Sequence, residues 1–452
     1  MSITIDCFKA YDVRGRIPDQ LNADVAYRIG NATADFLDAK SIVICRDIRH
    51  SSDELADAVA RGLIEAGCDV LDIGVGGTEM VYFATSELGA DGGIMVTASH
   101  NPADYNGLKM VRAESRPISG DTGLQDIRRI AEQDERRVAD KPGEHRNVDV
   151  SDQYIQKLLS FVDTAALTDL KVVVNAGNGA AGPTLDLLEP HLPFEFFKVH
   201  HEADGDFPNG VPNPMIEENR QSTIDAIRVT EADIGIAWDG DFDRCFFFDE
   251  NGRFIEGYYL VGLLAQGLLA GTSGEAVIYD PRLVWNTIET VDALGGRPVQ
   301  SKSGHSFIKE VMRAEDAVYG GEMSAHHYFR DFYYSDSGMI PWLLVTQLLC
   351  ESGESFSSHV DACMRKYPIS GEINREVPDA QAAIRLISER YEGDAESVDT
   401  TDGVSMSFGN WRFNLRASNT EPVIRLNVET RGDTQLMEDK RDELLAILDS
   451  MG

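Results

Sequence analysis

The sequence predicts a multidomain α/β protein in which one α/β unit occurs three times and a smaller α+β unit follows. Its 452 residues exceed the size at which a single hydrophobic core stops growing. One pattern recurs three times: strand, helical stretch, strand, helical stretch, and a third strand that ends in a polar loop. After about residue 366, alternating strand-like segments replace this pattern.

Each copy of the repeat supplies three apolar strands and one polar loop. The first has strands at 41–45, 69–73 and 92–96, a helix at 53–67 and the loop TASHNP (97–102). The second has strands at 171–175, 194–199 and 233–238 and the loop DGDFDR (239–244). The third has strands at 276–280, 297–301 and 317–321 and the loop EMSAHH (322–327).

The last part of the chain predicts alternating strands with helices at 379–391 and 433–448. We place the four domains at 1–148, 149–252, 253–366 and 367–452. Ligands of parallel α/β sheets bind beyond the carboxyl ends of the strands. We therefore expect four loops, one from each domain, to line one central cleft.

Composition excludes some classes of partner. The 41 Lys and Arg against 76 Asp and Glu leave a net charge of −35, which repels nucleic acids and anionic lipid surfaces. The acidity indicates a solvated surface, and a high-salt habitat would favour the same composition. The six cysteines form no CxxC pair, and no apolar window is long enough to span a bilayer. We expect a cytoplasmic protein that binds neither nucleic acid nor membrane.

The loop TASHNP places Ser99 just past a predicted buried strand, beside His100. A serine there is either a nucleophile or a turn-forming hydroxyl, and taken alone the turn is the commoner case. The chain has no GxSxG elbow, so a hydrolase triad has no support.

In DGDFDR the carboxylates of Asp239, Asp241 and Asp243 recur at every second residue, so one extended segment aims them at one point. Three hard oxygen ligands suit Mg²⁺, and without a cation they would repel one another. A solvated acidic loop is the alternative. An EF-hand fails because Arg244 stands where that loop needs glycine and because a strand precedes it.

Two further loops offer polar groups. RASNTEP (416–422) provides a guanidinium, hydroxyls and an amide that suit a phosphate dianion, although a polar hairpin turn is about as frequent. GEMSAHHYF (321–329) provides a carboxylate and a hydroxyl that suit sugar hydroxyls. Its adjacent His326 and His327 point to different faces, an arrangement more often structural than metal-binding.

A GxGxxG motif supports a different class of protein. Gly177, Gly179 and Gly182 follow a strand, and Glu202 lies near the position of a ribose-binding acid, as in dinucleotide-binding folds. Two residues separate the apolar strand core from the first glycine, and Pro183 follows the last. We keep a dinucleotide-binding enzyme as the alternative to a phosphosugar enzyme.

Taken together, the motifs resemble the α-D-phosphohexomutases. The resemblance runs from Tyr11 to about Val428 and rests on six motifs in order: YDVRG (11–15), TASHNP (97–102), DGDFDR (239–244), KSGHSFIK (302–309), GEMSAHHYF (321–329) and RASNTEP (416–422). It implies three α/β/α domains with mixed sheets and a smaller α+β C-terminal domain.

The resemblance also implies roles for individual residues. Ser99 would carry a phosphoryl group and, with Asp239, Asp241 and Asp243, bind Mg²⁺. The expected catalytic residues are Ser99, His100, Lys109, Arg14, Arg244 and His305, with Lys109 and His305 as candidate proton carriers. The expected substrate-binding residues are Tyr11, Arg282, Glu322, Ser324, His326, Arg416, Ser418, Asn419 and Thr420. Some family members have a lysine in the loop that here, at 280–285, offers only Arg282.

The implied activity interconverts mannose 6-phosphate and mannose 1-phosphate through a hexose 1,6-bisphosphate, which also serves as activator, with some action on glucose phosphates. The expected partners are small hexose phosphates, and the expected assembly is a monomer or small homo-oligomer. Supply of GDP-mannose is the implied pathway. A Mg²⁺-dependent phosphatase and a sugar-phosphate sensor without turnover are the alternatives.

Overall fold

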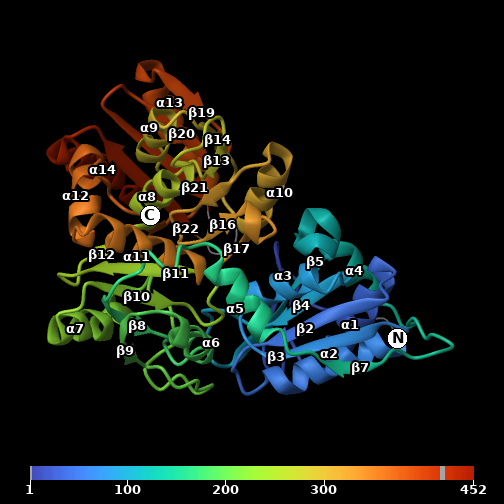
Figure 1. Ribbon diagram of the computed structural model, residues 1–452. Helices are drawn as coiled ribbons and strands as arrows, with labels where there is room; N and C mark the ends of the chain where they lie inside the picture. Colours follow the sequence, from blue (N-terminus) through green and yellow to red (C-terminus); the bar gives the residue numbers. More distant parts are fainter. Residues whose placement is uncertain (1–2, 418–422, 452) are drawn as a thin grey trace. The chain divides into compact units, whose positions relative to one another are not determined.

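The computed structural model describes residues 3–417 and 423–451 (Figure 1). The chain divides into two compact units. Unit 1 comprises Met1–Phe254 and His326–Gly353, and unit 2 comprises Ile255–Ala325 and Glu354–Gly452. The short strand β12 (Phe254–Ile255) contains the first boundary between them.

The first sheet of unit 1 is mixed, in the order β1-β5-β4-β2-β3-β7, with β6 beside β5. The central strands β4, β2 and β3 are parallel, and β5 runs antiparallel to β4 and β1. Helices α1 and α2 pack side by side (Figure 1), while α3 packs against β2 and β4. The elements are β1 (Val13–Arg16), α1 (Ala23–Leu37), β2 (Ser41–Arg46), α2 (Ser52–Glu65), β3 (Asp69–Val75), α3 (Thr78–Glu87), β4 (Gly92–Val96), β5 (Tyr105–Arg112), β6 (Arg116–Pro117), α4 (Gln125–Ala131) and β7 (His145–Asn147).

The second sheet of unit 1 carries the order β11-β10-β8-β9, in which β10, β8 and β9 are parallel and β11 is antiparallel. Every residue of β10 and β11 is buried, which fits the continuous apolar runs of a strand covered on both faces. The elements are α5 (Ser151–Leu159), β8 (Lys171–Asn175), α6 (Ala181–Leu188), β9 (Glu195–Val199), α7 (Gln221–Thr230), β10 (Ile234–Trp238), β11 (Cys245–Asp249), the antiparallel pair β16 (His327–Phe329) and β17 (Ser335–Asp336), and α11 (Ile340–Ser352).

Unit 2 contains parallel strands in the order β14-β13-β15 and an antiparallel sheet in the order β18-β22-β21-β20-β19. Its helices and strands are α8 (Gly257–Leu269), β13 (Ala276–Tyr279), α9 (Trp285–Ala293), β14 (Arg297–Gln300), α10 (His305–Glu315), β15 (Tyr319–Gly321), α12 (Phe356–Lys366), β18 (Ile373–Glu376), α13 (Ala380–Tyr391), β19 (Ser397–Asp399), β20 (Val404–Ser407), β21 (Trp411–Ala417), β22 (Val423–Thr430) and α14 (Thr434–Asp449).

The predicted strands of the repeat are confirmed, with ends shifted by no more than two residues. The repeat pattern alone did not include the antiparallel strands β5 and β11, which follow the polar loops and make the sheets mixed. Both loops therefore connect a parallel strand to the antiparallel strand beside it, so each loop must turn back on itself within a few residues.

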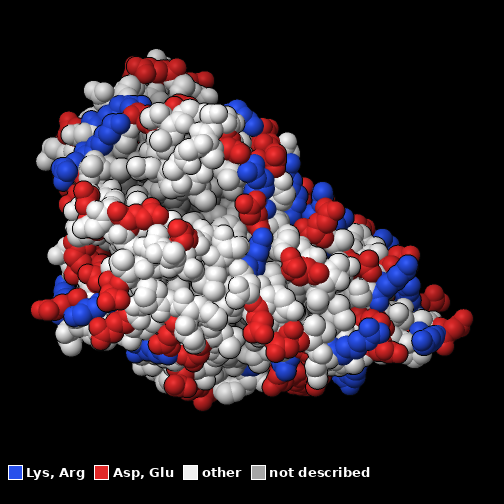
Figure 2. All heavy atoms as spheres, viewed as in Figure 1, with Lys and Arg blue, Asp and Glu red and all other residues white. Residues whose placement is uncertain are grey.

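Figure 2 shows acidic side chains interspersed with basic ones on the visible face. Within residues 3–417 and 423–451, no helix has the length and apolar content needed to cross a membrane.

Candidate active site

Ser99 lies in the loop between β4 and β5, and it is 3 % exposed. Its backbone adopts a left-handed φ of 51°, and its N–H donates to Thr97 Oγ1 over 2.8 Å. The Ser99 hydroxyl donates to Asp239 Oδ2 over 2.9 Å and lies 3.0 Å from His100 Nδ1. A buried serine in an uncommon backbone conformation, aimed at a carboxylate, indicates a functional role beyond that of a turn.

The three aspartates of DGDFDR lie directly after β10, and their ligand atoms are all within 4.8 Å of one another. Asp239 and Asp241 are fully buried, and Asp243 is nearly so. Phe242, between two of them, is buried and has a left-handed φ of 42°, and its N–H donates to Asp239 O over 3.1 Å, so the segment turns here and is not extended.

The residues present fit a divalent cation. Oδ1 of Asp241 and Oδ1 of Asp243 are buried and accept no hydrogen bond from any residue that the structure describes. Buried carboxylate oxygens without donors are costly, and hard oxygen ligands are what Mg²⁺ prefers. The acidic cluster is therefore suited to bind a metal ion.

Two positively charged side chains form ion pairs with the three aspartates. Lys109, on β5, donates from Nζ to Asp241 Oδ2 over 2.6 Å and to Asp243 Oδ2 over 2.5 Å. Arg244 donates from Nε to Asp239 Oδ2 over 2.8 Å. These ion pairs compensate part of the negative charge of three buried carboxylates.

Two more predicted residues lie near Ser99. Burial, and then the positive charge of Arg244, lower the pKa of His100 well below its usual value, so His100 is neutral and accepts from Arg244 Nη2 over 2.5 Å. Arg14, on β1, donates from Nη1 to Asn101 Oδ1 over 2.6 Å and pairs with Asp12. Tyr11, also predicted to bind substrate, is half-buried three residues before Arg14.

His326 belongs to unit 1 and lies beside the aspartates. Its Nδ1 is 3.0 Å from Asp336 Oδ2 and 4.0 Å from Asp243 Oδ1. The neighbouring His327 is fully buried, and burial lowers its pKa to about 3. The two adjacent histidines therefore differ: His327 is part of the core, and His326 faces the carboxylates.

Sequence reasoning missed Thr78, the first residue of α3. Its hydroxyl donates to Asp241 Oδ2 over 2.5 Å, and its backbone N–H donates to Asp241 O over 3.1 Å. Gly77 allows this approach, because a Cβ there would lie 2.4 Å from the ring of Phe242. A threonine at a helix start has the appearance of a cap, so its sequence carried no signal of this contact.

In unit 2, the predicted sugar-binding loop is tied to the loop after β13. Arg282 is 4 % exposed and forms two bonds of 2.8 and 2.9 Å with Asp280. It also reaches Glu322 Oε1 at 3.5 Å and Ser324 Oγ at 3.3 Å. Glu322 Oε1 accepts a hydrogen bond of 2.9 Å from the N–H of Gly304, the residue before the predicted proton carrier His305. Arg282 thus orients the carboxylate of Glu322 in this structure.

Arg416 is the last residue but one of β21, and its Nη2 donates to Glu372 Oε2 over 3.1 Å. Glu372 also lies 3.5 Å from Arg282 and 3.4 Å from Arg425. Burial acts to raise the pKa of Glu372, but the arginines hold it below its usual value, so Glu372 stays charged. The remaining predicted residues of this loop, Ser418, Asn419 and Thr420, lie outside the described residues.

The glycines of the GxGxxG motif are explained by packing. A Cβ on Gly182 would lie 2.1 Å from His201 O, and one on Gly177 would lie 2.4 Å from Pro212, where Gly177 also has a left-handed φ of 57°. A Cβ on Gly179 would lie 3.0 Å from Gly240 O. The motif therefore allows close approach of neighbouring backbone, and this does not require a dinucleotide.

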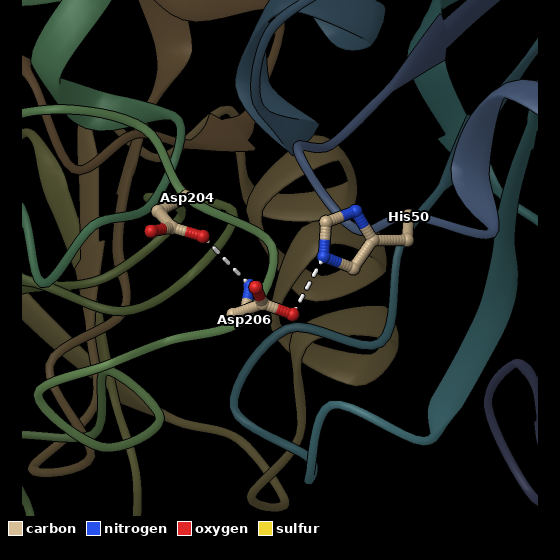
Figure 3. Close-up of side chains that lie close together, drawn as sticks. All are labelled: His50, Asp204 and Asp206. Atoms are coloured by element: carbon tan, nitrogen blue, oxygen red, sulfur yellow. Dashed lines mark hydrogen bonds and ion pairs between the residues drawn. The ribbon is translucent and has the colours of Figure 1, made fainter.

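Another group of possible metal ligands in unit 1, formed by His50, Asp204 and Asp206, was not predicted (Figure 3). His50 Nε2 lies 2.8 Å from Asp206 Oδ1, and both side chains are more than two-thirds exposed. The N–H of Asp206 is bonded to Asp204 Oδ1. Solvent satisfies such exposed groups, so this cluster has less need of a cation than the buried aspartates do.

Glu79, also missed from the sequence, is a fully buried carboxylate in the first turn of α3. It accepts from the Tyr154 hydroxyl (2.6 Å), the Ser337 hydroxyl (2.9 Å) and the N–H groups of Gly338 (2.6 Å) and Met339 (3.2 Å). Burial raises its pKa to about 8, although these hydrogen bonds oppose the shift. Glu79 therefore binds a proton more tightly in the folded protein than in the unfolded chain.

We expect this proton to make unit 1 less stable as the pH rises. Between about pH 4.5 and pH 8 the folded state retains a proton that the unfolded state has lost, so the contribution of Glu79 to stability decreases across this window. Between pH 5 and pH 8, the free energy of unfolding of Glu79→Gln should therefore rise relative to that of wild type by on the order of 3 kcal/mol. Denaturant titrations followed by Trp fluorescence measure this pH dependence of the free energy of unfolding. Glu87→Gln, at the other end of α3, is the control. Parallel pH curves for wild type and Glu79→Gln would contradict the expectation.

Comparison with known proteins agrees with this site. Four models of phosphoglucomutase/phosphomannomutase domains match the chain: α/β/α domain I at residues 6–138, domain II at 152–252, domain III at 256–367 and the C-terminal domain at 372–447. The Xanthomonas campestris pv. campestris protein named phosphohexose mutases is 57 % identical over 447 residues, with 99 % of this chain and all of that protein covered.

Two further relatives agree. A phosphomannomutase of Salmonella montevideo is 56 % identical over 453 residues, with 99 % of each chain covered. A crystal structure of a phosphoglucomutase/phosphomannomutase family protein from Burkholderia thailandensis superposes with a TM-score of 0.88 at 33 % identity, covering 99 % of this chain and 98 % of that one. A phosphohexomutase fold and a serine beside an acidic cluster define an enzyme that transfers phosphoryl groups within hexose phosphates. This chain belongs to the phosphoglucomutase/phosphomannomutase family.

Proposed function

We propose that this enzyme interconverts mannose 6-phosphate and mannose 1-phosphate through a phosphorylated Ser99. The observation that carries the proposal is the hydrogen bond of 2.9 Å from the Ser99 hydroxyl to Asp239, in a cluster with two buried carboxylate oxygens that no described residue satisfies. The relatives that carry the name phosphomannomutase support mannose as the sugar.

In the proposed reaction, phosphorylated Ser99 transfers its phosphoryl group to the free hydroxyl oxygen of a hexose monophosphate, and the hydroxyl proton passes to a base. The resulting hexose 1,6-bisphosphate would reorient and return its other phosphoryl group to Ser99, and the sugar oxygen that is released would take up the proton. Asp239, Asp241 and Asp243, with the Ser99 oxygen, would hold Mg²⁺, which when bound neutralises charge on the phosphoryl group.

The chain's own residues do the remaining work. Arg244 and Lys109 supply fixed positive charge beside Ser99, and charge stabilisation with positioning is what phosphoryl transfer requires most. Ser99 is 3 % exposed, which limits loss of its phosphoryl group to water. His305 remains a candidate proton carrier, and Lys109, ion-paired with two carboxylates, is better suited to hold charge.

In unit 2, Glu322 and Ser324 would bind sugar hydroxyls, and Arg416 with Ser418, Asn419 and Thr420 would bind the phosphate that does not react. Burial and ion pairing hold Arg282 against Glu322, which supports an indirect part in substrate binding. We further propose a cytoplasmic monomer or small homo-oligomer that is activated by hexose 1,6-bisphosphate and supplies mannose 1-phosphate for GDP-mannose.

The test is incubation with mannose 1-phosphate, Mg²⁺ and catalytic glucose 1,6-bisphosphate. We expect mannose 6-phosphate to form without release of inorganic phosphate. Stoichiometric release of phosphate would indicate a phosphatase, and binding without conversion would indicate a sensor. Either result would overturn the proposal.

Glu322→Ala should impair mannose and glucose phosphates to a similar extent. A carboxylate can accept from the 3- and 4-hydroxyls, which the two sugars share, whereas they differ at the 2-hydroxyl. Losing a charge-assisted pair should lower kcat/KM roughly 30- to 150-fold for both. Parallel kinetics measure this, with Glu315→Ala, which breaks a surface pair with Arg297, as control. Loss with mannose phosphate alone would show that Glu322 recognises the 2-hydroxyl instead.

A further inference from the structure

The guanidinium of Arg49 is buried beneath the loop that carries Ser99. Arg49 lies between β2 and α2, and its side chain is 1 % exposed. Nη2 donates to the carbonyl oxygens of Ser99 (2.9 Å) and Asn101 (2.6 Å). Nη1 donates to those of Pro102 (2.7 Å) and Tyr105 (3.1 Å). The two terminal nitrogens of the guanidinium therefore bond three carbonyls of the Ser99 loop and that of Tyr105, the first residue of β5.

The charge of Arg49 is compensated from its own segment. Asp47 Oδ2 lies 3.2 Å from Arg49 Nε, and the Asp47 side chain is 2 % exposed. Asp47 accepts from the Ser52 hydroxyl (2.5 Å), and Ser52 accepts a bond of 2.9 Å from Asn106, the second residue of β5. A buried guanidinium is tolerated when its charge is paired, and here Asp47 supplies the charge while the four carbonyl oxygens accept from Nη1 and Nη2.

The other face of the guanidinium is covered as well. Its central carbon lies 5.1 Å from the centre of the Phe207 ring. In the same segment, the neighbouring His50 pairs with Asp206, the residue before Phe207 (Figure 3). The segment from Asp47 to Ser52 thus links the Ser99 loop with the loop around Phe207, all within unit 1.

The Ser99 loop needs such support. Ser99 has a left-handed φ, which costs an ordinary residue roughly 1–2 kcal/mol, and the surroundings must compensate. Of the four carbonyl groups, that of Ser99 belongs to a buried residue and that of Pro102 also accepts from the N–H of Tyr105, and a buried acceptor left unsatisfied costs about 1–3 kcal/mol. A lysine could keep the charge, but its single ammonium cannot reproduce the planar fork that bonds four carbonyls.

We propose that Arg49 is a positioning residue for phosphoryl transfer, which fixes the backbone of Ser99 so that Oγ meets the metal-binding carboxylates. The inference rests on the proposed function. It assigns to Arg49 no contact with substrate: Arg49 acts through the loop. Misplacing a reacting atom by about 1 Å costs roughly 100-fold in rate.

The test compares Arg49→Lys and Arg49→Ala with wild type. Phosphorylation of Ser99 by glucose 1,6-bisphosphate and Mg²⁺ is followed by intact mass and peptide mapping, and kcat and KM are measured separately. For Arg49→Lys we expect kcat to fall roughly 100-fold, with KM for the hexose phosphate nearly unchanged. For Arg49→Ala we expect partial recovery of kcat on addition of guanidinium ion at a non-denaturing concentration, and none with ammonium ion.

The matched control is Arg28→Lys, a mostly buried arginine of unit 1 that donates to Asp24 and to Gln133 O and is not bonded to the Ser99 loop. It should keep wild-type kcat. If Arg49→Ala does not fold, Arg49→Lys decides alone: wild-type kcat in that variant, or equal losses in kcat for Arg28→Lys, overturns the inference. Absence of phosphate on wild-type Ser99 overturns the proposed function, and the inference with it.

Discussion

Ser99→Ala is expected to abolish mutase turnover while the fold and hexose phosphate binding persist. The hydroxyl of Ser99 is the only group of that loop bonded to Asp239 in the described structure, and without it no phosphoryl group can be carried. We expect kcat to fall roughly 10⁴-fold or more, the scale seen when a nucleophile is removed. The methyl group fits the space left behind, so the thermal midpoint should change little.

Phosphopeptide mapping tests whether Ser99 carries the phosphoryl group, since wild-type protein treated with glucose 1,6-bisphosphate should carry phosphate on the peptide with Ser99. A coupled assay of mannose 6-phosphate measures the loss of turnover in Ser99→Ala. Ser119→Ala, a buried serine of another loop in the same domain, is the control and should retain activity. Full activity of Ser99→Ala, or phosphate on another residue, would contradict the assignment of Ser99 as the phosphoryl carrier.

Asp241→Asn is expected to have the second-largest effect. It replaces one of three metal-binding carboxylates, which weakens the metal site and the neutralisation of charge during transfer. It also weakens the bonds that Asp241 accepts from Lys109 and Thr78. We expect kcat to fall roughly 10³-fold at saturating Mg²⁺ and the concentration of Mg²⁺ needed for half-maximal activity to rise.

Titration of activity with Mg²⁺ after treatment with a chelator separates the two effects. Asp206→Asn is the matched control, because it removes a carboxylate from the exposed cluster of Figure 3 and should leave the titration unchanged. Wild-type turnover of Asp241→Asn in chelated buffer would contradict the metal assignment. A shift of the Mg²⁺ titration in Asp206→Asn but not in Asp241→Asn would indicate that the required metal binds at the exposed cluster.

Local sequence was enough to predict the parts whose signal lies within a few residues. The alternation in DGDFDR predicted three carboxylates at one point, and the structure places them within 4.8 Å of one another. The apolar runs predicted the strands before Ser99 and Asp239, because continuous burial on both faces leaves a continuous apolar run in the sequence. The role of Ser99 needed more, since its loop alone also fits an ordinary turn.

The tertiary structure alone decided which distant groups complete the site. Arg49 lies 50 residues before Ser99, and Thr78 lies 163 residues before Asp241, so no periodicity or spacing relates them. Contact of Arg282 with substrate stays a prediction, and only the fold shows that Arg282 pairs with Asp280, Glu322 and Glu372. The physical reason is that burial obliges each charge and each backbone carbonyl to find a partner, and only the folded chain determines which partner is within reach.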